Sequence, residues 1–142
     1  MIISLILNTV TVGVVVFIHY EILYRMNQWL KVTGFRRRYR TVVGVIGALC
    51  AHAIEVWVFA LVYYLVHHQL DRGSLGGAFS GTLMDCVYFS FTAFSTLGFG
   101  DIVPLGDLRF LAGIEALTGL VLITWSASFL FLEMQSDWRR KD

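Results

Sequence analysis

The stretch Thr96-Leu97-Gly98-Phe99-Gly100-Asp101 decides the fold of this 142-residue chain. Its two glycines alternate with residues that carry side chains, and glycine is the residue that adopts positive φ freely. Backbone handedness that alternates in this way turns successive carbonyl groups toward the same side. We therefore expect residues 96–101 to form an extended strand with a row of carbonyl oxygens along one side.

A short apolar segment precedes this strand and runs from about Leu83 to Ser95. Thr82 is a plausible N-cap for it, and Asp85 places an acidic residue in the first turn. A membrane crossing takes about 20 residues, so this helix is too short to span and is typical of a re-entrant segment buried in protein. Its dipole would direct its negative end inward, where a cation would sit.

Three other apolar segments are long enough to cross a membrane. They run from about residue 4 to 26, from 42 to 67 and from 108 to 133. The chain is 57% hydrophobic but only 15% charged, whereas soluble domains carry about 25% charged residues. The first segment lacks the basic start and the cleavage site of a signal peptide, so we expect it to be retained. The predicted fold class is an all-α membrane protein with three transmembrane helices, a re-entrant helix and an extended strand.

The basic residues predict the orientation of these spans. Nine of the eleven lie between the first two spans or in the C-terminal tail, which places both segments in the cytoplasm and the N-terminus outside. The re-entrant helix then enters from the external face, and residues 73–77 are expected to be a flexible external loop. The cytoplasmic set is Arg25, Lys31, Arg36, Arg37, Arg38, Arg40, Arg139, Arg140 and Lys141, and the external set is Arg72 and Arg109. We interpret the arginine run as a topology signal that is compatible with membrane lipid, and we expect no nucleic-acid binding.

Four strands like residues 96–101 around one axis would stack rings of carbonyl oxygens that replace the water shell of a cation. Non-helical backbone is tolerated at membrane depth where it is buried in protein or lines a wet path. The stretch YFSFTAFSTLGFGDIVP (Tyr88–Pro104) resembles the pore loop of the potassium-channel superfamily. Its filter with Phe is most similar to those of the two-pore-domain channels.

The resemblance covers about residues 42–133 and implies a homotetrameric, potassium-selective channel subunit that is not an enzyme. It divides the chain into an N-terminal helix with a basic loop (1–41), a pore domain (42–134) and a short tail (135–142). The resemblance implies no cofactor, with K⁺ as the transported ion. The implied K⁺ ligands are the carbonyls of Thr96, Leu97, Gly98 and Phe99 and the Thr96 hydroxyl, in a filter that Gly100 and Asp101 complete.

The sequence departs from the usual filter of this family at three positions. Leu97 replaces a Val behind the filter, and Thr92 stands where some members have an acid. Phe99 replaces a Tyr and so loses a hydroxyl that could hold the filter rigid. A weakly selective cation channel of the same architecture is therefore the alternative function.

The last span carries three candidate gating residues. The resemblance implies a hinge glycine about twenty residues beyond the filter, where Gly119 falls, although close helix packing would explain this glycine equally well. Phe131 is the candidate for a hydrophobic constriction. Glu115 lies inside the span, where we expect a hydrogen bond behind the filter rather than a place at the outer interface. On this alignment the cavity-facing residues are Leu120, Ile123, Ala127 and Phe131.

His52 and Glu55 share one face of the second span, and His19 and Glu21 lie near the cytoplasmic end of the first. Together they suggest a metal site or a proton relay, but mutual hydrogen bonding between the helices is the simpler purpose. A membrane metal-binding protein or enzyme that uses His52 and Glu55 remains the alternative from a different class. The chain has no catalytic or nucleotide-binding motif. A compact single module of this kind indicates a prokaryotic plasma membrane.

Overall fold

Three long helices form the frame of the computed structural model, which describes residues 2–32, 37–70 and 73–138. They are α1 (Ile2–Val32), α2 (Arg37–Leu65) and α4 (Leu108–Trp138), and a π-helical turn, η1 (Val66–Leu70), continues α2. All three are long and apolar enough to cross a membrane, which confirms the predicted spans. Five basic residues used to predict the orientation lie outside the described residues: Arg36, Arg72, Arg139, Arg140 and Lys141.

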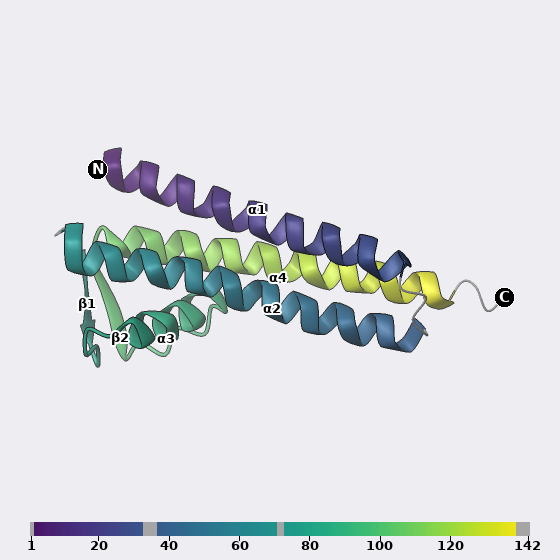
Figure 1. Cartoon of the computed structure of the whole chain (residues 1–142). Coiled ribbons are helices and arrows are strands. Elements are labelled where there is room, and N and C mark those ends of the chain that lie inside the picture. Colours follow the sequence, from purple (N-terminus) through teal and green to yellow (C-terminus); the bar gives the residue numbers. More distant parts are fainter. Residues whose placement is uncertain (1, 33–36, 71–72, 139–142) are drawn as a thin grey trace.

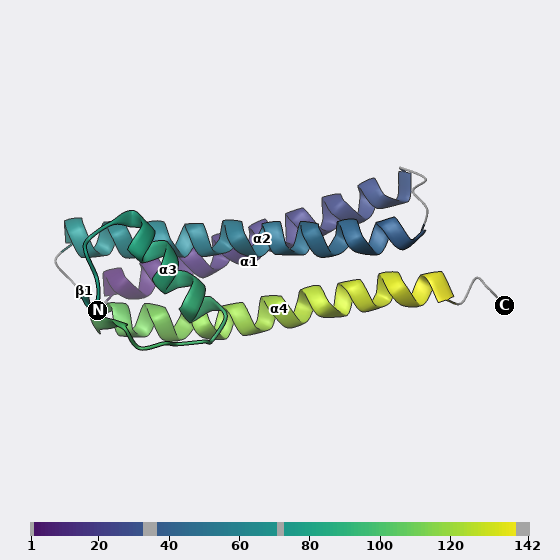
Figure 2. The same ribbon diagram turned by 90° about the horizontal axis from the view of Figure 1, so that it is seen from below.

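The helices are arranged in three layers (Figure 1). α2 and α4 lie side by side in the middle, and α1 lies across one face of this pair. The opposite face carries the short helix α3 (Leu83–Phe94) together with β1 (Gly73–Gly77) and β2 (Ile102–Gly106). Figure 2 shows the same arrangement from the side of α3, with α1 behind the other helices. The described N-terminal end of α1 and the two strands share one end of the molecule, as the predicted topology requires.

The predicted re-entrant helix is present as α3, and it begins at the predicted residue. The Thr82 hydroxyl accepts a hydrogen bond from the Asp85 amide at 3.1 Å, and the Asp85 carboxylate accepts from the Thr82 amide in return. This reciprocal capping box satisfies two amides that a helix start leaves without partners. The Asp85 carboxylate also accepts from the Ser80 amide at 2.8 Å, and this bond lowers the pKa of Asp85 below its usual range.

Residues 73–77 are not a flexible loop, and that prediction was wrong. They form β1, which pairs antiparallel with β2 so that Leu75 lies opposite Pro104 and Gly77 opposite Ile102. The glycines of β1 allow neighbouring backbone to approach closely and do not make the segment flexible. Gly77 has φ +82°, and a Cβ there would overlap the carbonyl oxygen of Asp101. The two strands therefore hold the chain that leaves the 96–101 segment against η1, which continues α2, and against α4.

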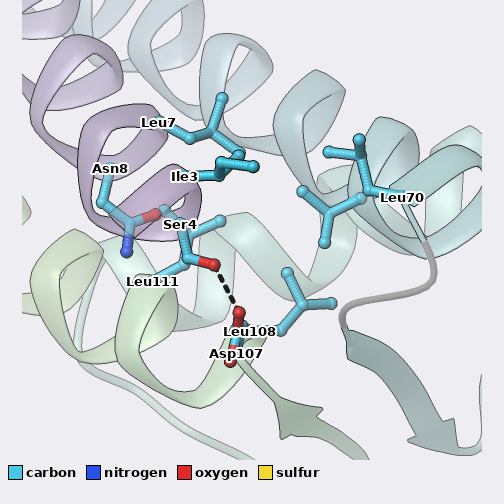
Figure 3. A pocket seen from close by; sticks show the side chains of 9 residues that line it. Ile3, Ser4, Leu7, Asn8, Leu70, Asp107, Leu108 and Leu111 are labelled. Atoms are coloured by element: carbon cyan, nitrogen blue, oxygen red, sulfur yellow. Dashed lines mark hydrogen bonds between the residues drawn. The ribbon is translucent and has the colours of Figure 1, made fainter. Parts of the chain in front are cut away.

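One face of α1 packs on the rest of the chain. Its buried residues recur every three or four positions, as a helical face requires, and they are Asn8, Thr11, Val15, His19, Leu23 and Leu30. Near its start the Ser4 hydroxyl donates to the carboxylate of Asp107, beside a small cavity between α1 and the ends of α2 and α4 (Figure 3). The other face of α1 exposes large apolar side chains such as Val10 and Phe17, as expected for a helix in contact with lipid.

Candidate functional site

The backbone of residues 96–101 has the alternating handedness that its glycines predict. φ is +59° at Thr96, +54° at Gly98 and +80° at Gly100. Thr96 is the one non-glycine residue with positive φ in the part of the chain that the structure describes. A conformation of this kind costs on the order of 1 kcal/mol outside glycine, so the surrounding structure must impose it.

Hydrogen bonds to the end of α3 impose this conformation. The Thr96 amide donates to the carbonyl oxygen of Ala93 at 2.9 Å, and the Gly98 amide donates to that of Thr92 at 3.1 Å. Both amides therefore point back toward α3. With its amides turned to α3, the strand is fixed at its inner end to the last turn of the re-entrant helix.

Within one chain the strand is covered only in part. The side chains of Leu97 and Phe99 are 60% and 64% exposed. A hollow of about 370 Å³ lies against the strand, and α3, β2 and α4 contribute its walls through residues such as Phe89, Pro104 and Ala112. Apolar side chains this exposed beside an open hollow are typical of a surface that another protein chain covers.

The outer end of the strand is held by Tyr88, a residue that the sequence did not single out. Its hydroxyl donates to the carboxylate of Asp101 at 2.8 Å, and its ring stacks on Phe99 with an interplanar angle of 11°. The bond to the carboxylate raises the pKa of Tyr88, so the hydroxyl remains a donor at neutral pH. The Asp101 carbonyl accepts from the Ala78 amide at 2.8 Å. Tyr88 thus supplies a hydroxyl next to Phe99, which has none.

Glu115 of α4 is fully buried where α4 meets α2 and α3. Its carboxylate accepts a hydrogen bond from the Tyr63 hydroxyl at 2.5 Å and lies 2.5 Å from the Ser90 hydroxyl. The expected hydrogen bond is therefore present, and the alternative of a side chain at the outer interface is wrong. The Ser90 hydroxyl has one hydrogen but also lies 2.9 Å from the carbonyl oxygen of Val56. A proton on Glu115 would satisfy both contacts and would spare the span a buried charge.

The other two candidates on α4 lie in contrasting surroundings. Gly119 is buried, and a Cβ there would overlap the carbonyl oxygen of Phe94 at the end of α3. This is the close packing that was one of its two interpretations. Phe131 is 59% exposed near the opposite end of α4 and points away from the core of the chain. Leu120, Ile123 and Ala127 are likewise exposed.

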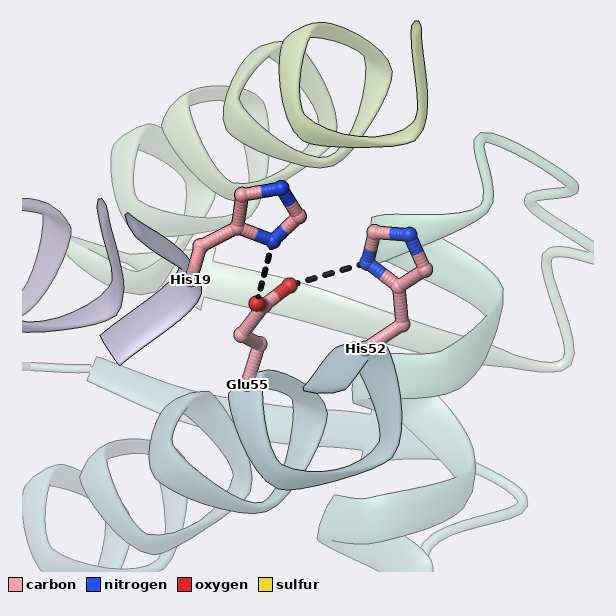
Figure 4. Close-up of side chains that lie close together, drawn as sticks. All are labelled: His19, His52 and Glu55. Carbon is pink, nitrogen blue, oxygen red and sulfur yellow. Dashed lines mark hydrogen bonds and ion pairs between the residues drawn. The ribbon is translucent and has the colours of Figure 1, made fainter. Parts of the chain in front are cut away.

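His19 of α1 and Glu55 of α2 make the predicted hydrogen bond between the two helices, and His52 of α2 contacts the same carboxylate (Figure 4). Nδ1 of His52 lies 3.0 Å from Oε2 of Glu55, and Nδ1 of His19 lies 2.7 Å from Oε1. Glu21 is not part of this cluster, because its carboxylate pairs with Arg25 one turn away. The cluster joins α1 to α2, and the ring of His52 packs near Phe94 at the end of α3.

Comparison with known protein families identifies a family that covers more than half of the chain. The family described as "Ion channel" matches residues 51–136. The match covers the second half of α2, all of α3, the 96–101 strand and nearly all of α4, and it leaves out α1. Searches of curated proteins and of solved structures found no match.

Proposed function

This chain belongs to the ion channel family, whose members are potassium-channel pore modules with two spans, and from this premise we propose that it is one subunit of a homotetrameric, potassium-selective channel. The observation that carries the proposal is the alternation of positive φ at Thr96, Gly98 and Gly100. Such alternation turns carbonyl oxygens to one side, and rings of these oxygens can replace the hydration shell of K⁺. Family membership also supports a protein that is not an enzyme.

In this proposal the carbonyls of residues 96–99 and the Thr96 hydroxyl bind K⁺ in the filter. The C-terminal end of α3 adds the negative end of its helix dipole, because α3 ends at Phe94 and only its C-cap, Ser95, separates it from the strand. Asp101 adds negative charge at the outer mouth, where Tyr88 holds its carboxylate. No cofactor is required beyond the transported ion.

Four copies would complete the pore, since each chain supplies a single strand and a closed ring needs cyclic symmetry. The exposed side chains of Leu97 and Phe99 support this assembly, because neighbouring copies would bury them. α1 lies on the face of the α2–α4 pair opposite α3, so a tetramer with its strands at the axis carries α1 at its periphery, in contact with lipid.

The proposed orientation places the N-terminus outside and the C-terminus in the cytoplasm of a prokaryotic plasma membrane. The positive-inside rule supports this orientation. α3 and the described start of α1 share one end of the molecule (Figure 1), which agrees with a filter that opens to the external face. We propose that Phe131 forms a hydrophobic gate at the cytoplasmic end, and that Gly119, beside the end of α3, sets how α4 moves against α3.

Ion flux through liposomes that contain the purified chain tests this function. Under a potassium gradient we expect rapid flux, and under a matched sodium gradient very little. Gly98→Ala should abolish flux, because φ +54° is strained for any residue with a Cβ. Gly13→Ala is the matched control, since it makes the same change in α1 where nothing lies within 4 Å of the added Cβ. Undiminished flux in the Gly98 variant would rule out the proposed filter.

A weakly selective cation channel is the second candidate, and one observation favours it. Phe99 has no hydroxyl, and its ring is held by stacking on Tyr88 while 64% of the side chain is exposed. A filter wall held by stacking alone can adjust to a smaller ion. Comparable flux under the two gradients, lost in the Gly98 variant, would identify this second function.

A further inference from the structure

Three ligand-type side chains converge between α1 and α2, and the ring centroid of His52 lies 5.7 Å from that of Phe94 at the end of α3. One ligand atom from each of His19, His52 and Glu55 lies within 4.8 Å of the others. Figure 4 shows both imidazoles turning Nδ1 toward the same carboxylate. Their sequence separation is large, because His19 belongs to α1 and lies 36 residues before Glu55. The packing of α1 on α2 therefore assembles the cluster.

The donor set is that of a transition-metal site. Two imidazole nitrogens and one carboxylate oxygen are the protein ligands of many zinc centres that keep a fourth position for water. The remaining nitrogen of His19, Nε2, lies 3.4 Å from the Ser126 hydroxyl on α4. A metal-bound histidine typically uses its second nitrogen in this way, and such a partner fixes the orientation of the ring.

Burial and charge also favour a cation at this position. The side chains of Glu55 and His19 are fully buried, while that of His52 is 16% exposed and leaves an approach from one side. With both imidazoles neutral, the cluster would hold an uncompensated carboxylate inside a membrane span, which is costly. A divalent ion bound by the three side chains offsets this charge.

The contacts of 2.7 and 3.0 Å between the nitrogens and the Glu55 oxygens are hydrogen-bond distances. A tetrahedral ion about 2.1 Å from each donor separates neighbouring donors by about 3.4 Å. The imidazoles must therefore open by several tenths of an ångström, which small side-chain rotations provide. We propose that His19, His52 and Glu55 bind one divalent transition-metal ion of the Zn²⁺ type, which ties the N-terminal helix α1 to the pore module.

The test measures metal binding by the full chain, free of any affinity tag, in detergent micelles. After equilibration with Zn²⁺ and dialysis, elemental analysis should find one ion per chain. Co²⁺ in place of Zn²⁺ should give the intense visible absorption of a tetrahedral site. His52→Ala should weaken binding at least tenfold and abolish the cobalt band, and Ser126→Ala should weaken it by roughly tenfold while keeping the band.

The matched control removes the other histidines of the chain. A His67→Ala/His68→Ala double variant deletes the pair at the outer end of α2 and should bind Zn²⁺ as the unaltered chain does. If His52→Ala fails to fold, as judged by gel filtration, Glu55→Gln keeps the shape of the side chain and should also lose the ion. Binding that persists in both cluster variants, or a chain that retains no Zn²⁺ and gives no cobalt band, would overturn the site. The cluster would then be a hydrogen-bonded triad that shares a proton. None of these measurements depends on ion flux.

Discussion

Tyr88 is the side chain that holds the outer half of the 96–101 strand. Its ring stacks on Phe99 and its hydroxyl donates a hydrogen bond to Asp101. One residue of α3 therefore fixes the side chains on both sides of Gly100. Tyr88→Phe keeps the stacking and removes the hydrogen bond. A bond to a charged group contributes about 1.5 kcal/mol or more, so we expect potassium-over-sodium selectivity to fall roughly tenfold. Flux of the two ions through liposomes measures the ratio.

Tyr20→Phe provides the control for this change, because Tyr20 lies on the exposed side of α1 and stacks on Tyr24. It should leave selectivity unaltered. Equal selectivity in the Tyr88 and Tyr20 variants would mean that the Asp101 carboxylate is held by other contacts.

The sequence identified the polar residues that need a partner inside the spans, but it did not identify the hydroxyl groups among those partners. Glu115 and His52 stand out because a charge or an imidazole inside an apolar span needs a reason. Tyr63, Ser90 and Tyr88 do not stand out, because hydroxyl side chains are common in membrane helices. Which hydroxyl meets which carboxylate depends on how the helices are rotated against one another, and no local pattern records that rotation.

α3 and α4 approach each other closely beside the proposed filter. This approach depends on Gly119, where a Cβ would overlap the carbonyl oxygen of Phe94. The backbone at the end of α3 could relieve this overlap only by shifting, and a shift would also displace the strand. Gly119→Ala should therefore destabilise the fold by about 1–3 kcal/mol. Thermal unfolding in detergent measures this loss. Gly13→Ala on α1 should instead be neutral or stabilising, because the space is open and alanine favours a helix.

If Gly119→Ala leaves the unfolding temperature unchanged but alters the voltage or time dependence of conduction, the hinge interpretation of this glycine would be correct and the packing interpretation would fail.

The capping box of α3 makes the stability of this element depend on pH. The pKa of Asp85 is lowered in the folded chain, chiefly by the Ser80 amide. Its contribution is therefore fully present above the unfolded value near pH 4 and is lost as the pH falls through the lowered folded value. Asp85→Asn should flatten the acid side of the stability curve below about pH 4. A variant that keeps the slope of the unaltered chain would assign the effect to other groups.

Phe131 belongs to the stretch of α4 that exposes apolar side chains near its C-terminal end. If it closes the pore by excluding water, Phe131→Ala should raise the leak of the closed state several-fold. Leu132→Ala is the control, because the next residue is equally exposed but points about 100° away around the helix. Unchanged leak in the Phe131 variant would reject this residue as the gate.

The elements themselves could be predicted with uneven success. Hydropathy found all three spans, and the Thr82–Asp85 pair located the start of α3 to the residue. The β1–β2 pair was missed, because Gly73–Gly77 has no alternation of apolar and polar residues and its partner contains Pro104. β1 and β2 pair because α3 and residues 96–101, which lie between them in the sequence, bring the chain back beside β1. That path is a property of the tertiary fold.

The whole molecule presents an incomplete surface along the 96–101 strand, and four copies of the chain are expected to complete it. Native mass spectrometry from detergent should therefore give a mass four times the 16.1 kDa of one chain. A chain that remains monomeric at every detergent concentration that supports flux would contradict the tetramer. The family match to the pore module leaves α1 without a counterpart, so the assembly should form from contacts of α2, α3 and α4.

α1 also changes how the molecule meets the bilayer. Because it lies across α2 and α4 on the face opposite α3, a hydrophobic compound dissolved in the membrane meets α1 before it can reach the seam between the two pore helices. The lateral path by which such a compound could pass from the lipid to this seam is therefore more obstructed here than in a module of two spans alone. Blockers of this chain should act from the aqueous ends, and an apolar drug that partitions into the membrane should find little access through this face.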